Sequence, residues 1–60
     1  MGGRGVIYTV TVDDITYWSK RKLDAIYKHI EYRYYNESEF RVVTESRLQS
    51  IKRNNKVEQL

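Results

Sequence analysis

The stretch that decides the fold is Val6-Ile7-Tyr8-Thr9-Val10-Thr11-Val12, a run in which every side chain is β-branched or aromatic. Such side chains favour extended backbone, and successive residues of a strand point to opposite faces. The run therefore predicts a β-strand over residues 6–12. Its core-facing side would carry Val6, Tyr8, Val10 and Val12, and a partly wet side would carry Ile7, Thr9 and Thr11.

Residues 15 to 35 contain no glycine or proline, and apolar side chains recur through them at helical spacing. We predict a long amphipathic helix from Ile15 to about Tyr35. Asp13 and Asp14 precede it and are interpreted as its N-terminal caps. The apolar side chains fall within an arc of about 120° that we expect to be buried: Ile15, Leu23, Ile26, Tyr27, Ile30 and Tyr34.

Residues 39–56 support two interpretations. In the first, Phe40 to Thr44 form a strand, and Ser46-Arg47-Leu48-Gln49 is a capping box that opens a short helix ending near Asn54. In the second, Asn36-Glu37-Ser38-Glu39 is itself a capping box and residues 40–51 form a second helix. We favour the strand, because the Val-Val-Thr run has poor helix propensity.

The predicted fold is a small α/β domain in the order strand, long amphipathic helix, strand, short C-terminal helix. The two strands are expected to be parallel, because a helix crosses between them. The alternative is strand-helix-helix. Residues 1–5 are expected to be a flexible glycine-rich leader, residues 6–54 a single domain, and residues 55–60 a frayed polar tail.

The 60-residue chain has no cysteine and no proline. Disulfides and a cysteine-based zinc site are thereby excluded, and a core this small leads us to expect a homodimer. No run reaches the ~18 apolar residues of a membrane span, and no signal peptide is evident. The sequence thus predicts a cytoplasmic protein that does not enter a membrane.

The residue types present give little support for a catalytic function. Nucleophilic catalysis needs an activated nucleophile beside a base, and the single histidine, His29, lies on the predicted helix with no cysteine to activate. Asp13 and Asp14 are adjacent and would diverge. We predict no catalytic residue, no metal site and no cofactor, and hence a protein that is not an enzyme.

A second stripe on the predicted helix alternates rings and cations outside the aliphatic arc: Trp18, Arg21, Ala25, Lys28, His29, Tyr32 and Tyr35. Rings that stack on bases, together with cations that neutralise phosphates, are typical of nucleic-acid-binding surfaces. The same residues are the usual hot spots of protein interfaces, and they could also simply pack a thin core or a dimer seam.

The formal charge of +3 favours an acidic partner. Our functional prediction is a small dimeric regulator that binds nucleic acid, with the choice between DNA and RNA left open. The alternative is an inhibitor or adaptor that docks on a partner protein through the same aromatic stripe. The predicted binding residues are Trp18, Arg21, Lys28, Tyr32, Tyr35, Lys52 and Arg53.

The order strand, helix, possible helix, carried by Tyr8-Thr9-Val10-Thr11-Val12-Asp13 and Ser38-Glu39-Phe40, resembles the ribbon-helix-helix family of DNA-binding repressors. The resemblance covers order and not spacing. It implies a strand that pairs across a dimer axis in the major groove, with Ile7, Thr9 and Thr11 reading bases. It also implies a second helix beginning at Ser38-Glu39.

Overall fold

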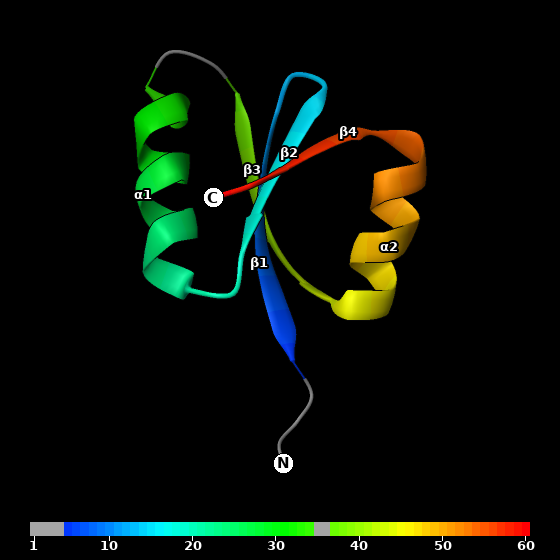
Figure 1. Cartoon of the computed structure of the whole chain (residues 1–60). Coiled ribbons are helices and arrows are strands. Elements are labelled where there is room, and N and C mark those ends of the chain that lie inside the picture. Colours follow the sequence, from blue (N-terminus) through cyan, green and yellow to red (C-terminus); the bar gives the residue numbers. More distant parts are fainter. Residues whose placement is uncertain (1–4, 35–36) are drawn as a thin grey trace.

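A computed structural model describes residues 5–34 and 37–60 as a four-stranded sheet with a helix on each face (Figure 1). The strand order across the sheet is β3-β1-β2-β4. The small α/β class is confirmed. The elements are β1 (Val6–Val12), β2 (Ile15–Ser19), α1 (Lys22–Arg33), β3 (Ser38–Thr44), α2 (Glu45–Asn54) and β4 (Lys56–Gln59).

The predicted helix is wrong over its first third, because residues 15–19 form β2. Asp13 and Asp14 do not cap a helix but make the two-residue turn of a hairpin, in which Val12 pairs with Ile15. Asp13 adopts φ 56°, a left-handed conformation that aspartate tolerates better than most residues. The β-branched and aromatic side chains of residues 15–18 then favour a strand.

The predicted parallel pairing is also wrong, and the hairpin explains why. Because β2 reverses the chain before α1 begins, β3 returns antiparallel to β1, with Val10 opposite Phe40. Strand over residues 38–44 confirms the strand interpretation of Phe40 to Thr44, and the strand-helix-helix alternative is wrong.

The C-terminal helix is confirmed over Glu45–Asn54, but its cap differs from the prediction. Thr44 is the N-cap residue, and its hydroxyl accepts a hydrogen bond from the Arg47 N–H at 3.2 Å. Residues 55–60 were expected to be a frayed tail, whereas Lys56–Gln59 form β4, which pairs with β2 in parallel. The Leu60 N–H extends this pairing by donating to the Trp18 carbonyl at 2.8 Å. The predicted leader, residues 1–5, lies outside the described residues except for Gly5.

Alternation along β1 divides the core between the two faces of the sheet. Val10 and Val12 face α1 and form one buried cluster with Ala25, surrounded by the half-buried rings of Tyr8, Tyr17, Tyr32 and Phe40. Ile7 and Thr9 face α2, whose one buried residue is Leu48. The predicted wet face of β1 is therefore covered.

The ribbon-helix-helix expectations do not hold in this fold. Both edges of β1 are hydrogen-bonded within the chain, to β2 and to β3, so β1 has no edge with which to pair across a dimer axis. Ile7 and Thr9 are only 1% and 2% exposed and cannot reach bases. Ser38-Glu39 begins a strand and not a helix.

Candidate interaction surface

The side of helix α1 that packs on the sheet is the side that was predicted to face outward. Ala25 is fully buried, and Lys28, His29 and Tyr32 are half-buried against the strands. A short link sets this orientation where β2 ends: the Ser19 hydroxyl accepts from the Arg21 N–H at 2.9 Å and donates to the Asp24 carboxylate at 3.3 Å. The expectation that the aliphatic arc is buried is therefore wrong.

Four side chains of the arc instead form an exposed stripe, which we call the outer α1 face: Leu23, Tyr27, Ile30 and Tyr34, with exposed fractions of 60%, 64%, 55% and 82%. Of the other two, Ile26 is half-buried and Ile15 lies in β2. Its steps of four, three and four residues keep these side chains in line along one side of a helix. At about 200 Å² for a fully exposed side chain of this size, the face offers roughly 500 Å², near the upper limit for a monomeric protein.

Cations lie beside the outer α1 face. His29 touches β3, and at 100° per residue Lys22 and Arg33 fall on the same flank of the helix as His29. Both are exposed, as are Lys20 and Arg21 just before the helix. None of these four makes an ion pair within residues 5–34 and 37–60. The acidic residues of α1 are already engaged, Asp24 by Ser19 and Glu31 by Lys28.

The predicted binding residues do not share one surface. Trp18 lies in β2 and not in the helix, and its neighbour in space is Lys52 of α2, whose Nζ is 5.6 Å from the indole centroid. Arg21 precedes α1 and Arg53 lies in the last turn of α2, and both are exposed. Tyr35 lies outside the described residues.

Lys28 and Tyr32 belong to a cluster on the inner side of α1. The Lys28 Nζ lies 5.2 Å from the ring centroids of both Tyr17 and Tyr32, which stack at 5.8 Å with an interplanar angle of 11°. Hydrogen bonding to Tyr32 raises the pKa of Tyr17 above 10.0, and burial adds to this effect. These rings and this cation join α1 to β2, so little of their surface is available for stacking on nucleic-acid bases.

One pairing of functional groups was missed by the sequence reasoning. The His29 Nδ1 and the Ser38 Oγ lie 2.6 Å apart, within the range of a nucleophile and its base. Catalysis also requires a group that orients the imidazole, and within residues 5–34 and 37–60 the bond to Ser38 is the one hydrogen bond that the His29 ring makes. This contact joins α1 to β3. The His29 ring joins the same two elements, because its centroid lies 5.8 Å from the centroid of the Phe40 ring.

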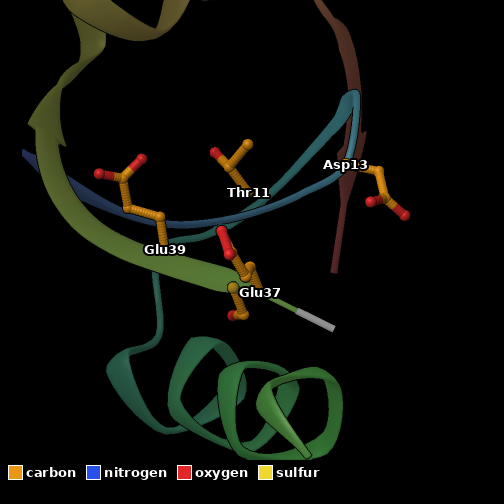
Figure 2. Close-up of a pocket in the computed structure, with 5 residues that line it drawn as sticks. Thr11, Asp13, Glu37 and Glu39 are labelled. Carbon is orange, nitrogen blue, oxygen red and sulfur yellow. The ribbon is translucent and has the colours of Figure 1, made fainter. Parts of the chain in front are cut away.

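Surface hollows lined by described residues include the following two. The larger, about 460 Å³, is lined by Thr11, Asp13, Glu37, Ser38 and Glu39, and Figure 2 shows the carboxylates of Asp13 and Glu39 on opposite sides of Thr11. The smaller, about 220 Å³, lies beneath α2 over Thr9, Thr11 and Thr16, beside the Arg41–Glu39 ion pair. Among the described residues, no three acidic, histidine or cysteine side chains converge enough to hold a metal ion.

Comparison with known proteins adds no assignment: no protein-family model, no curated protein and no solved structure matches this chain. Within the described residues, no helix has the length and apolar character needed to cross a membrane.

Proposed function

We propose that this chain is a small, non-enzymatic, homodimeric interaction protein that docks on a partner protein through the outer α1 face. The observation that carries the proposal is the orientation of α1, which directs the aliphatic side of an amphipathic helix to solvent. Large exposed apolar stripes are costly to keep on a monomer and are typical of binding surfaces.

The occupant that fits the face best is an amphipathic helix with acidic flanks. Positions 23, 27, 30 and 34 present the 4-3-4 spacing with which one helix packs along another. Lys22 and Arg33 border the stripe with no acidic partner in the described chain, so carboxylates on the incoming helix would complement them. A second copy of α1 would instead bring the same cations.

Nucleic-acid binding is the second candidate, and the exposed Lys20-Arg21-Lys22 run supports it. Its weakness is that the rings predicted to stack on bases are engaged elsewhere: Trp18 by Lys52, and Tyr32 by Tyr17 and Lys28. The exposed rings of Tyr27 and Tyr34 would have to replace them, and the phosphate contacts of the neighbouring cations would make the binding salt-sensitive.

The test uses two synthetic helical peptides with leucine at the same 4-3-4 positions, one flanked by glutamate and the other by lysine. Fluorescence anisotropy should show at least about tenfold tighter binding of the acidic peptide. Ile30→Ser should weaken that binding about tenfold or more, since apolar anchors at the centre of an interface dominate its affinity. Gln49→Ser, an exposed change on α2, is the matched control and should have no effect.

The same titrations with random duplex and single-stranded DNA across a salt series separate the two candidates. Phosphate contacts would give a log-log slope of several units, about 0.9 per contact on duplex DNA, which Lys22→Ala would lower. Such a slope, with neither peptide bound, would overturn the protein-docking proposal. Equal binding of both peptides, or binding that survives Ile30→Ser, would also overturn it.

A further inference from the structure

Strand β3 forms one edge of the sheet, and one side of its backbone has no neighbouring strand among residues 5–34 and 37–60. Seven residues long, it is a longer edge than β4, which has four. A long edge strand presents unpaired N–H and C=O groups that readily accept another strand. Proline, which would block such pairing, is absent from the chain.

The side chains of β3 are arranged symmetrically about Phe40. Glu39 and Arg41 stand on either side of it, both well exposed and directed to the α2 side of the sheet. Val42, which is 54% exposed, lies with Phe40 on the α1 side. Within one chain the Arg41 guanidinium already reaches the Glu39 carboxylate at 2.8 Å, so the two groups lie close together at this edge.

When two identical strands pair antiparallel, they are related by a two-fold axis perpendicular to the sheet, and directly opposed side chains point to the same face. The axis must therefore pass between the two copies of one residue, on which we say that the register is centred. Centring on Phe40 places Glu39 opposite Arg41 of the second copy, twice. Centring on Glu39 or Arg41 instead places like charges opposite each other at the axis, which is destabilising. Centring on Val42 keeps like charges apart but places Arg41 opposite Val43, so the register centred on Phe40 is the one that also pairs opposite charges.

We propose that β3 pairs antiparallel with β3 of a second copy, in the register centred on Phe40, to form an eight-stranded sheet. This inference rests on the homodimer in the proposed function and names its interface. In this register Val42 lies opposite Ser38 of the second copy. The two α1 helices lie antiparallel on one face of the joined sheet, with both outer α1 faces still open to partners.

Charge reversal tests the register. Sedimentation at micromolar concentration should give a dimer for the unaltered chain and at least about tenfold weaker association for Glu39→Arg or for Arg41→Glu, since each puts like charges opposite each other twice. The double variant E39R/R41E should recover association to within about threefold. Glu58→Arg makes the same change on the opposite edge, in β4, and should leave the dimer intact.

Disulfide trapping tests the geometry independently, because the chain has no cysteine of its own. Directly opposed residues have Cβ atoms about 4.5–5.5 Å apart, close enough for a disulfide after a small adjustment. An equal mixture of Glu39→Cys and Arg41→Cys chains should therefore oxidise mainly to the mixed dimer. Both positions are exposed, and each change removes only the exposed Arg41–Glu39 ion pair, which contributes little to stability.

The outcomes separate this inference from the proposed function. A chain that sediments as a folded monomer overturns the dimer and this interface together, while partner docking is judged by the peptide titrations. A dimer that survives both single reversals, or that weakens with Glu58→Arg, overturns the β3 interface alone. Statistical disulfide pairing of the two cysteine variants overturns the register.

Discussion

Replacing Val10 by alanine should destabilise the protein more than replacing Ile30, although the change at Ile30 deletes more carbon atoms. Val10 is fully buried in the central strand β1 and packs against Ala25 of α1. Val10→Ala removes two methyl groups, each worth about 0.8 kcal/mol on transfer from water. With the cavity left behind, we expect a loss of about 2–3 kcal/mol in the free energy of unfolding.

Ile30→Ala removes three carbon atoms, which would cost about 2.4 kcal/mol on transfer if the side chain were fully buried. Because this side chain is 55% exposed, roughly half of that loss, about 1 kcal/mol, applies. Alanine also has the higher helix propensity, which offsets several tenths of a kcal/mol. The net loss should lie between about 0 and 1 kcal/mol.

Thermal melts followed by far-ultraviolet circular dichroism measure both effects. At about 4–8 °C per kcal/mol for a domain of this size, Val10→Ala should lower Tm by roughly 10 °C or more and Ile30→Ala by at most a few degrees. Melts at two protein concentrations identify any contribution from self-association. An Ile30→Ala loss that equals the Val10→Ala loss in dilute solution would refute the assigned orientation of α1.

Three further perturbations test other parts of the fold. Thr44→Ala should cost about 1 kcal/mol by removing the α2 cap, whereas Ser46→Ala, at the first position of the capping box predicted from sequence, should change Tm by less than half as much. The raised pKa of Tyr17 contributes stability below pH 10 that is lost as pH rises through its folded-state pKa. Tyr17→Phe should therefore remove a step above the ordinary tyrosine pKa from the ultraviolet titration and flatten the alkaline loss of stability, and an unchanged titration in that range would argue against this contact. Deleting residues 56–60 should lower Tm, because β2 loses its β4 neighbour, and an unaltered melt would mean that β4 contributes nothing.

Local patterns in the sequence were sufficient where a segment's own residues decide its structure. The β-branched run 6–12 forms β1, Val-Val-Thr belongs to β3, and a helix covers residues 45–54. The amphipathic character of residues 22–33 is also local, since it depends only on spacing. The apolar stripe of the candidate site could thus be read directly from the sequence as an arc containing Leu23, Tyr27 and Ile30.

Whether that stripe faces inward or outward was decided by the tertiary structure. A helical period shows that one side of a helix is apolar, but two stripes were available, and the position at which β2 ends determines which of them meets the sheet. On that side of the sheet the rings of Tyr17 and Phe40 already supply apolar surface. The small side chain of Ala25 lets the helix approach the sheet closely, and Tyr32 and Lys28 pack on the Tyr17 ring.

The remaining differences are pairings between distant parts of the chain. Asp13-Asp14 lacks the glycine or asparagine that marks a two-residue hairpin turn, and the hairpin becomes visible only in the pairing of β1 with β2, where the hydroxyls of Thr11 and Thr16 lie 3.1 Å apart. The four residues of β4 carry little strand propensity and are ordered by the adjacent edge of β2. Sequence determines what each segment can become, whereas strand partners and helix orientation depend on contacts that exist only once the chain has folded.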